Sequence, residues 1–484
     1  MTTKAEMRVL FAASECWPLI KTGGLADVAY ALPLALTRIG ADVRVVIPAY
    51  RGLIDKLESA QPIRRIEIRG QSFGVIEGQL PGTPLKLWLI DAPYLYARDG
   101  DPYRDAAGHD FADNAWRFGC FSEVIYRLSM GAAGWQPDVV HANDWQTGPA
   151  LSWLSLEPVR PRTVFTIHNI AYQGWYGREA FDFLGLPPRL WSIDGVEMHG
   201  GFCFMKGGLT AADVITTVSP TYAREIQTRE YGYGLDPLLR WRAARLAGIA
   251  NGIDMEAWNP ATDPLLARRY TAASLRQGKN ANKRELQQEM GLAADVDAPL
   301  IGIVTRLAEQ KGTDLILGAL EPLLHAYPAL QFALLASGDR AQEQAWRDAA
   351  ARHPQRVGVQ LRYDERLAHR IEAAADIFLM PSRFEPCGLN QMYSQRYGTI
   401  PVVRRTGGLA DTVTDATPQT IADGSASGVM FNDADVGGVL WGVNRALELR
   451  GDPKIWKAMQ LAGMARDFSW ERAAAEYLRL YARP

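Results

Sequence analysis

A six-residue run, TGGLAD, occurs twice in this chain, at residues 22–27 and 406–411, with a cation before each copy. Each copy follows a short apolar run typical of a strand, at residues 9–12 and 400–403, and precedes a helical pattern. Two glycines at a strand-to-helix turn let the backbone approach a ligand closely, and the helix N-terminus offers unpaired N–H groups. The repeat therefore predicts two nucleotide-binding-type domains that share one anionic sugar ligand. Two ordinary tight turns are the alternative, but six consecutive identical residues are hard to obtain by chance.

Length and charge narrow the class of protein. A chain of 484 residues exceeds what one core usually supports, so we expect two domains. The net charge of −2, from 52 basic and 54 acidic residues, argues against nucleic acid and membrane surfaces as partners. Four scattered cysteines without a CxxC pair fit a reducing compartment. With no apparent signal peptide or membrane span, we expect a cytoplasmic protein, and its oligomeric state stays open.

Short runs of Val, Ile and Leu alternate with longer helix-period segments along the chain. The expected strands are residues 8–12, 43–47, 85–90, 139–141, 163–167, 214–218, 300–304, 332–336, 357–361, 377–380 and 400–403. Continuous apolar strands separated by helices predict parallel sheets covered on both faces. The fold class is therefore α/β, with two Rossmann-like doubly wound domains. We place them at residues 1–252 and 253–464, with a C-terminal helix in about 465–484 packing back on the first domain.

Charged side chains follow several of these strands, on the edge where doubly wound sheets bind ligands. Asp144 and His168 follow strands in the first half of the chain, and Arg306, Lys311 and Glu385 follow strands in the second. Two cations can neutralise a diphosphate, Arg through a bidentate fork and Lys as a point charge. We expect both in a polar, solvated loop, where their removal leaves the melting temperature almost unchanged. Glu385 can accept hydrogen bonds from a sugar or stabilise developing positive charge; alternatively it serves only the dipole of the next helix.

Other common cofactor and metal motifs are missing. The sequence has no HExxH, DxD, Cys/His cluster, Walker A or GxGxxG motif. Cys387 has no companion His nearby in sequence, so we expect a small packing residue rather than a nucleophile. The residues thus predict a metal-independent transferase that uses a sugar diphosphate donor.

Eight motifs, in order over essentially the whole chain, resemble the bacterial glycogen synthase and plant starch synthase family. They are KTGGLADV, HANDWQTG, FTIHNIAYQG, VSPTYAREI, NGID, TRLAEQKG, PSRFEPCGL and RTGGLADTV. The resemblance implies retaining transfer of glucose, typically from ADP-glucose, to the non-reducing end of an α-1,4-glucan such as glycogen. It also implies a GT-B fold, in which a first, acceptor-side domain and a second, donor domain face a deep cleft. ADP-glucose is then a substrate, and no cofactor or metal is expected.

The same motifs carry over the family's site residues. Catalytic roles fall on Arg306, Lys311, Glu385, His168 and Asp144. Substrate-binding roles fall on Lys21, Gly23, Gly24, Asn251, Tyr363 (which would stack on adenine), Cys387, Gly388, Leu389, Thr406, Gly407 and Gly408. Asp27 is expected to support the Lys21 loop. The chain has Asn143 where family members often carry His, and Asn390 where they often carry Thr.

Several alternatives stay open at this point. Front-face substitution is favoured, with the departing diphosphate accepting the proton of the acceptor hydroxyl; Asp144 remains a conceivable nucleophile for double displacement. A related transferase that makes trehalose or sucrose would share the fold, but the paired TGGL turns argue against it. A catalytically silent glucan-binding protein would have lost Arg306, Lys311 or Glu385. The sequence leaves the choice between ADP-glucose and UDP-glucose open.

Overall fold

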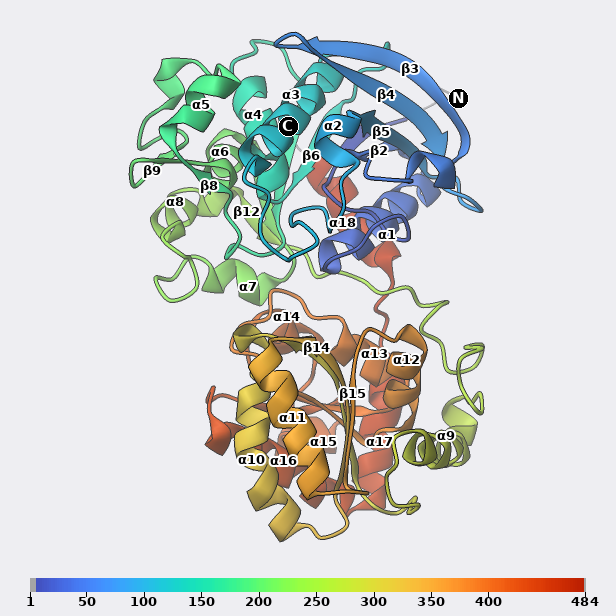
Figure 1. Cartoon of the computed structure of the whole chain (residues 1–484). Helices are drawn as coiled ribbons and strands as arrows, with labels where there is room; N and C mark the ends of the chain where they lie inside the picture. The colour runs from blue at the N-terminus through green and yellow to red at the C-terminus, as the bar shows by residue number, and fades with distance from the viewer. Residues whose placement is uncertain (1–5, 483–484) are drawn as a thin grey trace. The chain divides into compact units, whose positions relative to one another are not determined.

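Two α/β units make up residues 6–482, the part of the chain that the computed structural model describes (Figure 1). Unit 1 contains the chain up to Gly252 together with the segment from Trp470, and unit 2 is Ile253–Ser469. The division after Gly252 falls where the sequence analysis places the domain boundary. The returning segment begins at Trp470, a few residues later than expected.

Unit 1 is built on a nine-stranded sheet of order β12-β11-β7-β6-β1-β2-β5-β4-β3. Its strands are β1 (Arg8–Ala12), β2 (Asp42–Pro48), β3 (Glu58–Ile68), β4 (Gln71–Gln79), β5 (Lys86–Asp91), β6 (Val139–Asn143), β7 (Arg162–Ile167), β11 (Val214–Thr217) and β12 (Leu246–Gly248). The strands from β12 to β5 are parallel. The prediction of an all-parallel sheet is wrong at one edge, where β4 pairs antiparallel with both β5 and β3 (Figure 1). The β3 strand was missed because most of its residues are exposed, so it lacks a continuous apolar run.

Helices and a small sheet complete unit 1. The helices are α1 (Gly24–Arg38), α2 (Pro93–Tyr96), α3 (Asn114–Ser129), α4 (Gly148–Leu154), α5 (Arg178–Leu184), α6 (Phe204–Ala211), α7 (Pro220–Glu225), α8 (Asp236–Trp241) and α18 (Trp470–Tyr481). Short 3-10 turns are Ile54–Lys56, Trp145–Thr147, Pro188–Leu190 and Ala243–Arg245, and the small sheet joins β8 (Trp175–Tyr176), β9 (Glu197–Met198) and β10 (Gly201–Cys203). Helix α18 packs against α1, with an ion pair of 3.4 Å between Arg38 and Glu471. The C-terminal helix therefore belongs to unit 1.

Unit 2 contains a six-stranded parallel sheet of order β15-β14-β13-β16-β17-β18. Its strands are β13 (Leu300–Leu307), β14 (Gln331–Gly338), β15 (Val357–Leu361), β16 (Ile377–Met380), β17 (Ile400–Arg404) and β18 (Val429–Phe431). Its helices are α9 (Leu275–Glu289), α10 (Thr313–Ala326), α11 (Arg340–Arg352), α12 (Glu365–Ala374), α13 (Asn390–Arg396), α14 (Gly407–Thr412), α15 (Pro418–Ala422), α16 (Val436–Arg450) and α17 (Pro453–Met464), with 3-10 turns at Ala272–Ser274 and Glu309–Lys311.

Alternate residues of the unit 2 strands face two separate apolar layers, because successive side chains point to opposite faces of a sheet. Ile301 and Ile303 pack in a layer with α10 and α16, whereas Leu300 and Phe378 pack in a layer with α9 and α12. The helices thus cover both faces of the sheet. This leaves the carboxyl ends of the strands as the place for polar side chains.

The segment that enters unit 2 is held by aromatic and buried polar contacts. The Trp258 ring lies between His369 and Tyr393, with ring centroids 3.7 Å away on each side. The buried Asp263 carboxylate accepts hydrogen bonds from His369 Nδ1 (2.8 Å) and the Tyr397 hydroxyl (2.6 Å). The connecting segment is therefore part of the unit 2 core from Trp258 onwards.

The structure also bears on compartment and membrane. The four cysteines are buried free thiols. Across residues 6–482, no helix combines the length and apolarity needed to cross a membrane.

We expect Asp213→Asn to cost stability in a pH-dependent way. Asp213 precedes β11 and accepts a fork from Arg160 (2.7 and 2.8 Å) and the Thr163 N–H (2.8 Å). Burial opposes ionisation, but these donors lower the pKa of Asp213 to about 2. A lowered pKa stabilises the fold above the unfolded pKa, and this contribution is lost as the pH falls through the folded pKa. The deficit in unfolding free energy should be roughly 2 kcal/mol at pH 7 and about half that at pH 3, by urea denaturation. A deficit that stays constant with pH would contradict this account.

Candidate functional site

The first TGGLAD copy forms an open loop before α1. Lys21 Nζ lies 2.8 Å from Asp27 Oδ1, so Asp27 anchors the Lys21 side chain. A Cβ added at Gly23 or Gly24 would meet nothing within 4 Å. The backbone of this turn is therefore open for a ligand to approach.

A buried carboxylate that the sequence analysis missed lies beneath this loop. Glu15 is 3% exposed and accepts hydrogen bonds from Thr22 N (2.5 Å), Thr22 Oγ1 (2.5 Å) and Gly23 N (3.3 Å), and from the Tyr103 hydroxyl. The N–H groups of Thr22 and Gly23 thus already have a partner within the chain, and the anion contact expected at the N-terminus of α1 stays a prediction. Glu15 follows β1 closely, and the strand-end rule used elsewhere could have identified it.

Asp144 and His168, at the ends of the neighbouring strands β6 and β7, are brought together. The His168 backbone N–H donates to Asp144 Oδ1 at 2.8 Å. Asp144 has a φ of 55°, an uncommon value for a residue with a side chain. Burial raises the pKa of Asp144 to about 7, against the opposing effect of the His168 and Asn169 N–H groups. At neutral pH the carboxyl group is consequently divided between its protonated and ionised forms.

His168 is a neutral hydrogen-bonding group. Its Nε2 lies 2.9 Å from Asn143 Oδ1, and Asn143 Nδ2 donates to the Ala12 carbonyl at 3.0 Å. The second contact fixes the orientation of the amide, so Nε2 carries the proton and Nδ1 keeps its lone pair. Burial lowers the pKa of His168 to about 3, which excludes a role as a cationic acid at neutral pH. Asn143, a departure from the family motif, thus directly orients a predicted site residue.

In unit 2 the structure joins Lys311 to Glu385. Lys311 Nζ lies 2.6 Å from Glu385 Oε2, which also accepts the Ser382 hydroxyl at 3.0 Å. Glu385 is 4% exposed. Lys311 therefore compensates a buried carboxylate, so its removal is expected to cost stability, unlike the removal of a solvated cation. Removing the Lys311 side chain would leave the Glu385 carboxylate buried, with the Ser382 hydroxyl as its remaining donor of the two.

Arg306 matches the expectation of a solvated cation. It is exposed, near the carboxyl end of β13, and forms no ion pair within residues 6–482. Beside it, Asn390 Nδ2 donates to the Val304 carbonyl at 2.7 Å and ties the start of α13 to β13. Tyr363 follows β15 and is 77% exposed, which leaves its ring accessible for stacking.

The second TGGLAD copy packs against the chain itself. Thr406, Gly407 and Gly408 are buried, and Gly408 N donates to the Glu385 carbonyl at 3.0 Å. A Cβ on Gly407, where φ is 44°, would lie 1.9 Å from the Glu385 carbonyl oxygen, and one on Gly408 2.1 Å from the Cys387 carbonyl oxygen. These glycines are needed for close packing, and their contact with the donor stays a prediction.

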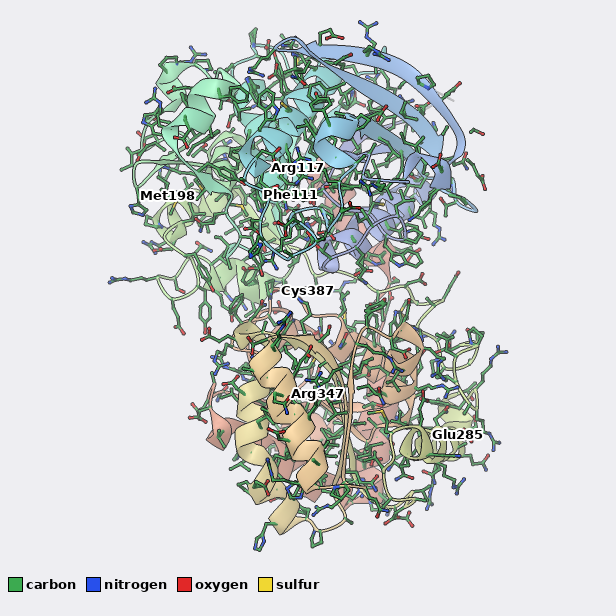
Figure 2. All side chains as sticks on the ribbon, viewed as in Figure 1. Phe111, Arg117, Met198, Glu285, Arg347 and Cys387 are labelled. Atoms are coloured by element: carbon green, nitrogen blue, oxygen red, sulfur yellow. The ribbon has the colours of Figure 1, made fainter. Side chains whose placement is uncertain are left out.

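The remaining predicted residues lie close to these two groups or to the boundary. Cys387 is buried in unit 2 (Figure 2), as expected for a packing residue. Gly388 has a φ of 70°, and Leu389 precedes α13. Asn251 is half-buried at the end of the first segment of unit 1. The predicted site residues thus form two sets, one in each unit.

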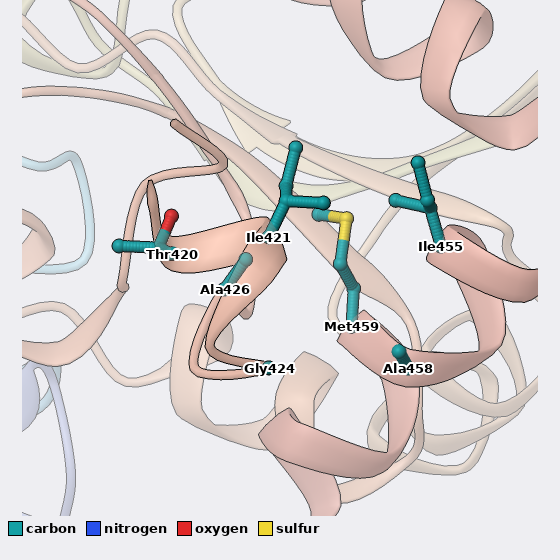
Figure 3. A pocket seen from close by; sticks show the side chains of 7 residues that line it. All are labelled: Thr420, Ile421, Gly424, Ala426, Ile455, Ala458 and Met459. Carbon is teal, nitrogen blue, oxygen red and sulfur yellow. The ribbon is translucent and has the colours of Figure 1, made fainter. Parts of the chain in front are cut away.

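One small cavity lies in unit 2, away from the predicted site residues. The cavity in Figure 3, between α15 and α17, has a volume of about 10 Å³, close to that of a single water site. Ile421, Ile455 and Met459 contribute to its lining, and none of the predicted site residues does. Within the described part of the chain, no group of three His, Cys, Asp or Glu side chains could hold a metal ion.

Comparisons with known proteins cover both units. Residues 8–241 match the family described as starch synthase catalytic domain, and residues 286–458 match glycosyl transferases group 1. The chain is 52% identical over 480 residues to a glycogen synthase from Thioalkalivibrio sulfidiphilus, covering 98% of this chain and 99% of the relative. The catalytic domain of starch synthase IV from Arabidopsis thaliana, bound to ADP and acarbose, matches with a TM-score of 0.88 and 34% identity over 99% of both chains.

A more distant likeness concerns the fold alone. Sucrose-phosphate synthase from Thermosynechococcus elongatus matches with a TM-score of 0.59 and 17% identity, over 98% of both chains. Together with the closer matches, it confirms the predicted architecture of two Rossmann-like α/β domains.

The two glycine turns should respond differently to the same substitution. Gly408→Ala places a methyl group 2.1 Å from a backbone oxygen, so we expect a loss of about 2 kcal/mol or more in unfolding free energy. Gly24→Ala, the matched position in the first copy, has open space at the start of α1 and should change stability by less than about 1 kcal/mol. Urea denaturation of both variants measures the contrast. Equal losses would mean that the two turns are packed alike.

Proposed function

The chain belongs to the glycogen synthase and starch synthase family, and from this premise we propose a specific reaction. The protein is a glycosyltransferase that transfers glucose from ADP-glucose to the non-reducing end of an α-1,4-glucan. The reaction elongates glycogen and releases ADP. Full-length similarity to a glycogen synthase and to an ADP-bound starch synthase supports the donor and the acceptor. The free thiols of the cysteines support a reducing, cytoplasmic location.

The Lys311–Glu385 pair beside the exposed Arg306 is the observation that carries this proposal. Negative charge builds on the ADP diphosphate as the glucosyl bond breaks, and the two cations stabilise it most in the transition state. Lys311 and Ser382 both donate to Glu385 Oε2 and so hold the Glu385 side chain in one orientation. Catalysis rests on positioning and on stabilisation of the leaving group.

Unit 1 supplies a neutral imidazole, His168, and a partly ionised carboxyl group, Asp144, as hydrogen-bonding groups. The neutral His168 and the adjacent Asp144 suit contacts to sugar hydroxyls. Because burial raises the pKa of Asp144 to about 7, much of this carboxyl group is protonated at neutral pH and is a weak nucleophile. This favours front-face substitution, in which the diphosphate accepts the proton of the acceptor hydroxyl, over a covalent intermediate on Asp144.

A coupled assay of nucleotide release tests the reaction. With glycogen present, ADP-glucose should give ADP and a lengthened glucan, and UDP-glucose should turn over more slowly. The rate should persist in excess chelator, because Lys21, Arg306 and Lys311 supply the positive charge. Release of nucleotide only with a phosphorylated sugar as acceptor would instead indicate a transferase of the sucrose or trehalose class. No binding of ADP-glucose, with glycogen binding retained, would indicate a silent glucan-binding protein.

The cations should separate catalysis from folding. Arg306→Ala should lower kcat by about 10²–10³, the effect of losing an oxyanion-type donor, while the melting temperature stays unchanged. Lys311→Gln should lower kcat similarly and also cost about 1–3 kcal/mol of stability, because it leaves Glu385 buried without its cation. Arg306→Lys should recover only part of the activity, since the bidentate fork is lost.

The matched control is Arg284→Ala, which removes an exposed cation from α9. It should leave both kcat and the melting temperature unchanged. A near-normal kcat in the Arg306 and Lys311 variants would show that this pair is not part of the transferring site.

A further inference from the structure

Helix α18 is linked to the strands of unit 1 through a buried chain of hydrogen bonds. The Tyr481 hydroxyl lies 2.6 Å from His141 Nδ1, and His141 Nε2 lies 2.5 Å from Thr166 Oγ1. Thr166 Oγ1 in turn lies 2.5 Å from Thr216 Oγ1. The four side chains come from α18 and from the adjacent strands β6, β7 and β11, and all are almost fully buried.

His141 is a neutral ring at the centre of these hydrogen bonds. Burial lowers the pKa of His141 well below its usual range. A neutral imidazole has one N–H and one lone pair, so the tautomer of His141 is set by its partners on both sides. The Phe11 and Tyr477 rings pack on the imidazole, with centroids 4.6 and 5.2 Å away, and restrict its rotation. The Tyr481 hydroxyl is therefore one of the two partners that set the tautomer of the His141 ring.

Thr166 connects this chain to the candidate site. The Thr166 hydroxyl is hydrogen-bonded to His141 Nε2. The Thr166 backbone carbonyl accepts a hydrogen bond from the Asp144 backbone N–H at 3.0 Å. Two residues after His141 on the same strand, Asn143 orients the ring of His168. Asp144 and His168 are thus both attached to strand ends that these buried hydrogen bonds hold.

We propose that Tyr481 is a positioning residue: through His141 and Thr166 it fixes the ends of β6 and β7 that carry Asp144 and His168. The C-terminal helix therefore contributes to turnover although it supplies no group to the substrate. This inference rests on the proposed transferase function.

The test is a double-mutant cycle with Tyr481→Phe and Thr166→Val, assayed with ADP-glucose and glycogen. Each change removes one hydroxyl and keeps the shape of the side chain. Each should lower kcat about three- to tenfold, the factor that one neutral hydrogen bond supplies, while KM for ADP-glucose changes less than twofold. Because both act through His141, the double variant should be no slower than the slower single variant.

Two matched controls separate positioning from general damage to the fold. Tyr477→Phe removes a hydroxyl from the same helix without touching the nitrogens of His141 and should keep kcat within twofold. Thr166→Ser retains the hydroxyl and should likewise keep kcat within twofold. A normal kcat for Tyr481→Phe, multiplicative losses in the double variant, or an equal loss in Tyr477→Phe would each overturn the proposal. An inactive wild-type protein would instead refute the proposed function.

Discussion

Three largely buried carboxylates, Glu15, Asp144 and Glu385, lie near the carboxyl ends of strands. The loops around them supply the hydrogen-bond donors that these carboxylates require. A buried carboxylate without hydrogen-bond partners is strongly unfavourable, so each must recruit donors from its surroundings. Glu15 takes the Thr22 and Gly23 N–H groups, Asp144 takes the His168 N–H, and Glu385 takes Lys311 and Ser382. The position of each loop follows from the carboxylate beneath it.

The kind of donor distinguishes the two carboxyl groups that face the proposed chemistry. Glu385 has a full cation at 2.6 Å, whereas Asp144 has backbone N–H groups, and burial raises its pKa to about 7. The Glu385 carboxylate is held by a cation, whereas the partly protonated Asp144 is suited to hydrogen bonding with sugar hydroxyls. The same arrangement explains why Arg306 and Lys311, five positions apart in the sequence, differ in role: one is a solvated cation and the other also maintains the fold.

The two copies of the TGGLAD run have the same sequence but different packing environments. In unit 1 the glycines border open space, and in unit 2 they lie against the carbonyls of Glu385 and Cys387. The local pattern, an apolar strand followed by a turn and a helix, is the same in both places. The surroundings of the second copy make the difference, because residues 385–387 of unit 2 pack against its glycines and make it a close-packed turn.

The sequence by itself determined the strands that are buried on both faces, the boundary region near residue 252 and the motifs that hold the candidate site, because apolar periodicity and strand-end polarity are local signals. It missed the exposed hairpin of β3 and β4, which has no continuous apolar run, and it missed Glu15. Only the tertiary structure paired Lys311 with Glu385, 74 residues apart, and Tyr481 with His141, 340 residues apart. A sequence pattern reports whether a side chain is buried, but the identity of its partner depends on which distant elements the fold brings beside it.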